Sequence, residues 1–212
     1  MKPVRAQKEI DKIKDNILSK ALDVIITDGF TALTMRRLAK DVGMTAPNIY
    51  NYFSNKDELF ITLTIKGFES LLSKLDSEMR LAKTPITRAQ AMLKTYLKFG
   101  LENSNYYEIM FTSRTPKYLD YVGTAHEILA KQELDVSMLL HQKTMAVLEE
   151  IAEEKKVELN DTKVKVVLTT LWSLLHGMVS LHNSNNTIYL VDNAETIYDE
   201  ILDKILLQVL SF

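Results

Sequence analysis

A cluster of hydrogen-bonding side chains lies in one short stretch of the chain, RRLAKDVGMTAPNIYNYFSNKDEL, from Arg36 to Leu59. Five of eight consecutive positions in it carry hydroxyl, amide or phenol groups, on Thr45, Asn48, Tyr50, Asn51 and Tyr52. Asparagine amides can pair with adenine in the major groove of DNA, and hydroxyls and cations bind phosphate oxygens. The residue types therefore predict recognition of double-stranded DNA.

The spacing of two apolar residues explains how these groups would be presented. Ile49 and Phe53 are four positions apart, so they share one face of a helix and leave the polar tips on the other. Thr45 is a suitable N-cap, and Pro47 falls in the first turn, where its missing N–H costs nothing. A preceding short helix, capped by Thr34 and ended by Gly43, would complete a helix-turn-helix unit.

Roles follow from the chemistry of each side chain. We expect base contacts from Asn48 and Asn51, and contacts with a thymine methyl from Thr45 and Ala46. The expected phosphate ligands carry hydroxyl, phenol or cationic groups, namely Thr34, Arg36, Arg37, Tyr50, Tyr52 and Lys56. Taken singly, an arginine belongs to a solvated helix face more often than to a DNA contact, and a tyrosine is more often a partly buried core residue.

The composition limits the class of protein. The 212 residues are 46% hydrophobic, with six glycines, four prolines and no cysteine, which favours an all-α globular chain without disulfides or thiolate metal sites. No apolar run reaches the roughly 20 residues of a membrane span, so a soluble cytoplasmic protein is expected. The net charge is −2, yet residues 1–60 hold ten Lys and Arg against eight Asp and Glu.

Helical periodicity extends over most of the chain. Runs of Leu, Ile, Met and Ala at three- and four-residue spacing predict helices, with polar loops at 113–123 and 183–193. The expected helices cover about 4–27, 35–42, 46–53, 56–83, 87–103, 105–112, 126–156, 161–183 and 194–210.

Short pairs of residues in the first quarter of the chain form a recognisable pattern, which runs through Ile17-Leu18, Ala21-Leu22, Gly29-Phe30, Thr34-Met35, Leu38-Ala39, Val42-Gly43, Ile49-Tyr50, Tyr52-Phe53 and Lys56-Asp57-Glu58-Leu59. With this spacing, the segment resembles the TetR family of transcriptional repressors. The resemblance implies a helix-turn-helix domain at 1–58 and a larger helical domain at 59–212 for effector binding and dimerisation. It also implies a homodimer that binds a palindromic operator and responds to a small effector. Trp172, His176 and Gly177 are similar to a subgroup with a Trp, His, Gly signature.

Methionine and aromatic residues of the larger domain suggest where an effector would bind, because such side chains line adaptable apolar pockets. They predict an apolar or amphipathic effector, although at helical spacing the same residues also suit a plain core. The candidate lining residues are Phe68, Leu72, Tyr96, Phe99, Met110, Phe111, Met138, His141, Met145, Trp172 and His176.

Two late helices are apolar over most of their circumference, which predicts a partner on each side and hence a two-fold dimer. The expected interface residues are Leu171, Leu174, Met178, Tyr198, Ile201, Leu202, Ile205 and Val209. A monomer with a fully internal helix pair is the alternative.

An enzyme is the rival class of function. The sequence has no nucleophile elbow, phosphate-binding glycine loop, HExxH or cysteine nucleophile, so we expect no catalytic residues, no cofactor and no metal site. A second rival is a constitutive dimeric DNA-binding protein without an effector.

Overall fold

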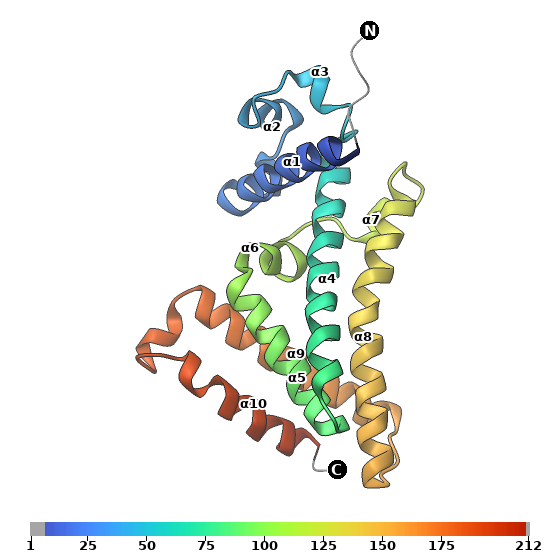
Figure 1. The fold of residues 1–212 in the computed structure, drawn as a ribbon, viewed down its shortest axis with the longest axis vertical. Helices are drawn as coiled ribbons and strands as arrows, with labels where there is room; N and C mark the ends of the chain where they lie inside the picture. Colours follow the sequence, from blue (N-terminus) through green and yellow to red (C-terminus); the bar gives the residue numbers. More distant parts are fainter. Residues whose placement is uncertain (1–6, 211–212) are drawn as a thin grey trace. The chain divides into compact units, whose positions relative to one another are not determined.

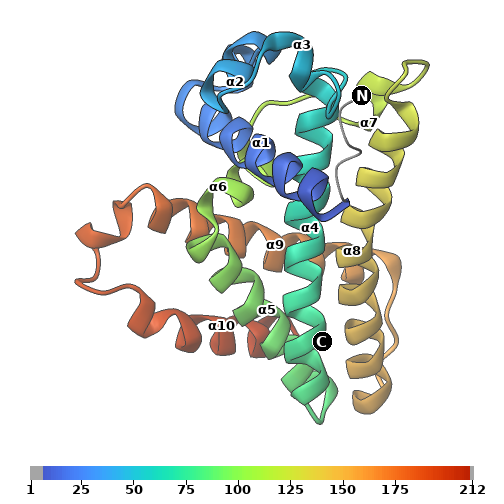
Figure 2. The ribbon, with the colours of Figure 1, turned by 45° about the horizontal axis from the view of Figure 1, so that its top comes forward.

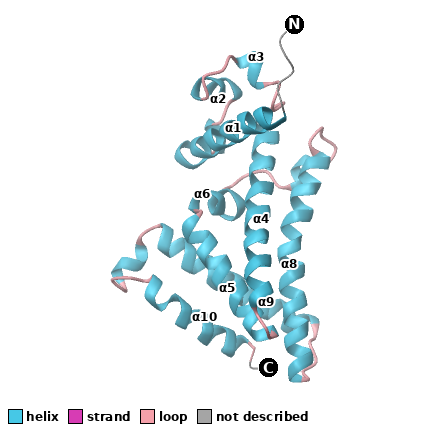
Figure 3. Ribbon diagram, in the orientation of Figure 1, coloured by secondary structure: helices cyan, strands magenta, loops and turns pink. Residues whose placement is uncertain are grey.

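The computed structural model describes residues 7–210, apart from the side chain of Val209. Over these residues the regular structure is helical, with no strand (Figure 3). The prediction of an all-α fold is therefore confirmed.

The described chain forms two compact units. Among the described residues, the first comprises 7–68 and 105–136, and the second comprises 69–104 and 137–210. Two long helices, α4 (Lys56–Leu81) and α8 (Glu127–Lys155), contribute residues to both units. The expected functional division into residues 1–58 and 59–212 stays a prediction.

The first unit begins with α1 (Gln7–Asp28), the 3-10 turn η1 (Phe30–Ala32), α2 (Met35–Asp41) and α3 (Ala46–Ile49) (Figures 1 and 2). Gly29 at φ 84° and Gly43 at φ 70° occupy the left-handed region after α1 and α2, where a side chain would be strained. Buried residues of α1 and α2 pack together beneath α3, including Ile17, Ala21 and Leu38. Helices α2 and α3, with the turn between them, thus form the predicted helix-turn-helix arrangement.

The same unit is completed by a later segment of the chain. It consists of α6 (Ser104–Tyr107), the π-helical turn η2 (Glu108–Thr112), α7 (Tyr118–Tyr121) and the beginning of α8. The η2 turn packs against α1, with Ile109 and Met110 buried. A long-range contact therefore supports the N-terminal helices.

Gly67 permits a close approach within this unit. A Cβ added there would lie 2.5 Å from Met110 Sδ and 3.1 Å from Tyr106 Cδ1. We expect Gly67→Ala to destabilise the chain by about 1–3 kcal/mol, because the methionine and tyrosine must move in a packed core. Urea unfolding measures this change, with Ser70→Ala on the exposed side of the same helix as the control. Equal stability of the two variants would contradict the close approach.

The second unit is organised around α5 (Pro85–Glu102), α9 (Asp161–Asn183) and α10 (Glu195–Val209). Each of these helices packs against the other two, and the 3-10 turn η3 (Asn186–Tyr189) lies between α9 and α10 in the chain. By length and composition alone α9 is apolar enough to cross a membrane. Packing against α5 and α10 covers part of that apolar surface, and the buried residues of α9 are Val167, Leu171, Leu175, Met178 and Val179.

Most predicted elements agree with the structure, and three differ. The expected helix at 46–53 is regular only over Ala46–Ile49, after which Asn51 N and Tyr52 N bond i−3 carbonyls, as in a tighter turn. The expected loops at 113–123 and 183–193 contain the one-turn helix α7 and the 3-10 turn η3. All three differences concern single turns, which hydrophobic periodicity cannot resolve.

Candidate nucleic-acid interface

The turn from Thr45 to Phe53 is anchored from below by two apolar side chains. Ile49 is fully buried and Phe53 is 3% exposed. Tyr52 N donates to Ile49 O at 3.0 Å, and Phe53 N donates to the same carbonyl at 3.2 Å. Burial of these anchors fixes which side chains face outward, as the sequence predicted.

The polar side chains of this turn lie at the surface. Thr45, Tyr50 and Asn51 are exposed, and Asn48 and Tyr52 are half-buried. Asn51 Nδ2 donates to Asn48 Oδ1 at 3.3 Å, which brings the two predicted base-reading amides together. We call the residues Thr45, Ala46, Asn48, Tyr50, Asn51 and Tyr52 the reading face.

The two predicted capping threonines behave differently. Thr34 Oγ1 accepts a hydrogen bond from Arg37 N at 3.2 Å and so caps α2. Thr45 occupies the N-cap position of α3 but its side chain makes no capping hydrogen bond. Its hydroxyl therefore keeps both donor and acceptor capacity for an outside group.

The predicted phosphate cations are held in distinct ways. Arg37 pairs with Asp28 at 2.5 Å and with Asp41 at 3.7 Å, so it joins α1 to α2 as well as carrying charge. Lys56 Nζ lies 4.5 Å from the centre of the Phe30 ring, a cation–π contact that holds its ammonium. Arg36 is exposed on α2. The structure thus gives Arg37 a structural role that the sequence did not predict.

Matches to known families agree with this geometry. Residues 17–63 match the model of bacterial regulatory proteins of the tetR family, and residues 89–205 match a tetracyclin repressor-like C-terminal domain. The second match alone covers more than half of the chain. This chain belongs to the TetR family. Because that family consists of transcriptional regulators, the prediction of a regulator rather than an enzyme is confirmed.

Individual relatives share part of their length with this TetR-family chain. It is similar to the nucleoid occlusion factor SlmA of Haemophilus influenzae, with 26% identity over 48% of the chain and 47% of the relative. It is also similar to the transcriptional activator FasR of Mycolicibacterium smegmatis, with 25% identity over 48% and 46%. The chain thus spans about half the length of these curated relatives.

The solved structure of the fatty acid degradation regulator FadR from Bacillus halodurans has the same fold over nearly the whole chain. The TM-score is 0.67 at 16% identity, covering 99% of this chain and 97% of that one. An N-terminal helix-turn-helix domain followed by a larger helical domain is therefore the fold of this TetR-family chain.

The predicted effector residues separate into two groups. In the first unit, the Phe68 and Phe111 rings meet edge to face at 5.5 Å. In the second, Tyr96 Oη lies 3.2 Å from His176 Nε2, and the His176 and Trp172 rings are 5.0 Å apart. Burial lowers the pKa of His176, which favours the neutral imidazole as the partner of Tyr96.

Three predicted effector residues do not lie in the interior of the chain. Met138 is 42% exposed, Trp172 is 56% exposed, and His141 is also exposed. The expectation that they line an internal pocket is corrected on this point, because the outer sides of α8 and α9 carry them. The other predicted residues, Leu72, Phe99, Met110 and Met145, are buried or half-buried.

The structure covers much of the expected dimer surface within one chain, and the interface itself stays a prediction. Leu171, Met178, Tyr198 and Leu202 are at most 8% exposed and pack inside the second unit. Leu174, Ile201 and Ile205 are half-buried, and the side chain of Val209 lies outside the described residues. On α9, Val166, Thr170, Ser173 and Leu181 are exposed, and the half-buried Gly177 lies with them on one helix face that has small residues at its centre.

The sequence did not indicate a cluster at the start of α4. Asn55, His126, Tyr121 and Asp57 meet there through two hydrogen bonds. Burial, followed by the carboxylate of Asp57, raises the pKa of Tyr121. No sequence motif could have revealed this cluster, because each of the two hydrogen bonds joins residues more than sixty positions apart.

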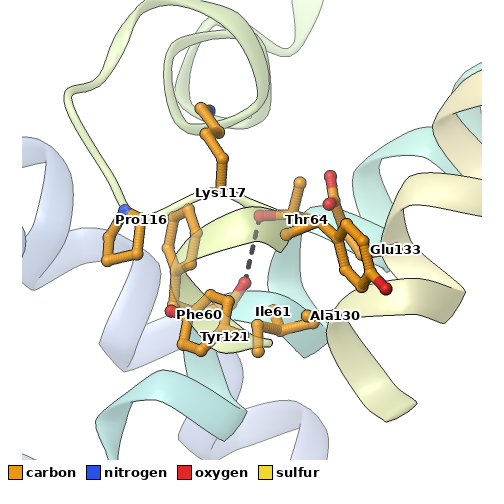
Figure 4. A pocket seen from close by; sticks show the side chains of 9 residues that line it. Phe60, Ile61, Thr64, Pro116, Lys117, Tyr121, Ala130 and Glu133 are labelled. Carbon is orange, nitrogen blue, oxygen red and sulfur yellow. Dashed lines mark hydrogen bonds between the residues drawn. The ribbon is translucent and has the colours of Figure 1, made fainter. Parts of the chain in front are cut away.

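Beside this cluster is a hollow that opens to solvent and has a cavity volume of only about 10 Å³ (Figure 4). Figure 4 shows the side chains of Phe60, Thr64, Tyr121 and Glu133 around it. Burial raises the pKa of Glu133. The hollow is far smaller than the roughly 300–1,000 Å³ of typical small-molecule pockets, and none of its lining residues belongs to the predicted effector set.

Proposed function

We propose that this protein is a ligand-responsive transcriptional repressor that binds a palindromic operator as a homodimer. The observation that carries the proposal is the reading face, held outward by buried Ile49 and Phe53. Lys56 and Arg36 supply positive charge near it, and the amides of Asn48 and Asn51 supply base-edge chemistry. Within the cell such a protein works in the cytoplasm, where the operator is.

Substitutions at two positions separate the two kinds of DNA contact. We expect Lys56→Ala to weaken binding to all sequences and to lower the slope of log affinity against log salt by about one, because one phosphate contact is lost. Asn48→Ala should instead reduce discrimination between operator and mutated operator by about 1–3 kcal/mol. Fluorescence anisotropy with the protein's own promoter, titrated with salt, measures both quantities.

The control for charge is Lys131→Ala. Lys131 is an exposed cation on α8 that pairs with Asp135. An unchanged salt slope in Lys56→Ala, or an equal change in Lys131→Ala, would count against the phosphate contact. If Asn48→Ala distinguishes operator from mutated operator as well as the wild type does, Asn48 does not read a base.

The effector is proposed to be a small apolar or amphipathic molecule that releases the protein from DNA. The buried Phe99, Met92 and Leu97 of α5 and the polar pair Tyr96–His176 support an apolar site with an orienting group in the second unit. FadR is named as a regulator of fatty acid degradation, so fatty acids and their thioesters are suitable first probes.

A constitutive dimeric DNA-binding protein is the second candidate function. The exposure of Met138, His141 and Trp172 favours it, since three expected lining residues face away from the interior. Thermal-shift measurements distinguish the two, because a molecule that binds the native state raises the melting temperature by mass action. A probe that raises the melting temperature and lowers operator affinity supports the effector.

A further inference from the structure

The first turn of α4 connects the helix-turn-helix segment to residues more than sixty positions away. Asn55 caps this helix: its Oδ1 accepts hydrogen bonds from the backbone N–H groups of Asp57 and Glu58, both at 3.0 Å. Asn55 follows Phe53 by two residues, so the cap also fixes where the end of the reading turn lies. The position of Asn55 therefore matters for the reading face.

The orientation of the Asn55 amide follows from its capping bonds. Because Oδ1 is used by two backbone donors, Nδ2 points the other way, where it lies 2.6 Å from His126 Nε2. An amide nitrogen only donates, so Nε2 of His126 must accept, and the imidazole carries its proton on Nδ1. The contact thus requires that the side chain of residue 126 has a hydrogen-bond acceptor at the position of Nε2.

A second hydrogen bond to the first turn of α4 comes from Tyr121, which belongs to the same segment as His126. Tyr121 Oη donates to Asp57 Oδ1 at 3.3 Å, and the Tyr121 and His126 rings stand perpendicular, 6.4 Å apart. The backbone of this segment is itself fixed, since His126 N donates to Thr124 Oγ1 at 3.1 Å and Thr124 Oγ1 donates to Tyr121 O at 2.7 Å. His126 is therefore presented by a preorganised loop rather than by a free side chain.

The same turn also touches the DNA-reading elements. Lys56 lies over Phe30, and the Phe30 and Phe60 rings meet at 5.1 Å. Ser54, the residue before the cap, donates to Glu58 Oε2 from both N and Oγ at 2.7 Å. A displacement of Asn55 would therefore move Lys56 and the turn that bears Tyr50, Asn51 and Tyr52.

We propose that His126 is a positioning residue for DNA binding, which acts by accepting the Asn55 hydrogen bond and so holding the first turn of α4 and the end of the reading face in place. This inference rests on the proposed function for its effect on DNA. Its structural part, the hold on the Asn55 cap, stands independently of DNA. Tyr121 supports the same turn through Asp57.

The test compares two substitutions in the full-length protein. His126→Leu removes the acceptor, whereas His126→Gln keeps one, because the glutamine Oε1 can accept from Asn55 Nδ2. Gln132→Leu, on the exposed side of α8, is the matched control. Hydrogen exchange of the Asp57 and Glu58 amides and operator affinity are both measured.

We expect His126→Leu to speed exchange of these two amides and to weaken operator binding by about three- to tenfold, which corresponds to one hydrogen bond. His126→Gln should restore both quantities towards the wild-type values, and Gln132→Leu should change neither. Restoration by glutamine separates an acceptor from mere packing.

Unchanged exchange in His126→Leu would overturn the proposal, and so would a glutamine variant that behaves like the leucine variant. Faster exchange with unchanged operator affinity would overturn the role in DNA binding. If the wild-type protein binds no operator, the proposed function fails, and the exchange measurement still decides whether His126 holds the Asn55 cap.

Discussion

Ile49→Ala should remove most operator binding at 37 °C and lower the free energy of unfolding by about 2–5 kcal/mol. Ile49 is fully buried beneath the reading face, so the substitution deletes apolar contacts and leaves a cavity there. Since α3 is only one turn long, few other contacts hold Asn48 and Tyr50 in position. A loss of this size is a large part of the 5–15 kcal/mol that stabilises a typical domain.

Ile128→Ala provides the matched control, because Ile128 belongs to the same compact unit and is 87% exposed. Urea unfolding followed by circular dichroism gives the stability of both variants, and anisotropy at 10 °C and 37 °C gives the operator affinity. Wild-type stability in Ile49→Ala, or an equal loss in Ile128→Ala, would show that Ile49 is not the anchor of the reading face.

Gly177→Arg should convert the proposed dimer into monomers and weaken operator binding by about 10²–10⁴-fold, because two linked half-site contacts become independent. Gly177 is central to the outward face of α9, between Ser173 and Leu181. A Cβ at Gly177 would meet no heavy atom of the chain within 4 Å. The structure therefore has room at Gly177 for the first atom of a side chain, and arginine is the better helix former by up to about 1 kcal/mol, so we expect the fold of one chain to stay intact.

At a two-fold interface, however, the two arginines would meet each other across the closest part of the contact. Light scattering at micromolar concentration reports the oligomeric state. Ser73→Arg adds the same charge at an exposed position of α4 and should leave the dimer intact. A Gly177→Arg protein that remains dimeric would place the interface on another surface.

The burial of the expected dimer residues shows what helical periodicity can and cannot resolve. The apolar residues of α9 at positions 161–183 correctly predicted a helix with these bounds. They did not reveal that Leu171 and Met178 face α5 and α10, whereas Val166 and Leu181 face outward. A helix that is apolar on most sides gives no internal signal of which side its own chain covers.

The sequence by itself determined the parts of this protein that depend on neighbouring residues. The capping threonine at position 34, the glycines at 29 and 43, and the pair Ile49 and Phe53 specify the helix-turn-helix unit through local backbone preferences and helix geometry. Those same residues carry the family resemblance, which is why fold class and family were predictable from the sequence.

Only the tertiary structure decided which distant groups meet. Arg37 joins Asp28 and Asp41, Met110 packs against Gly67, and His126 accepts from Asn55 across 71 positions of the chain. Such pairs depend on how helices pack, since residues far apart in sequence come together only after the core has placed their helices. Local propensity carries no information about that placement.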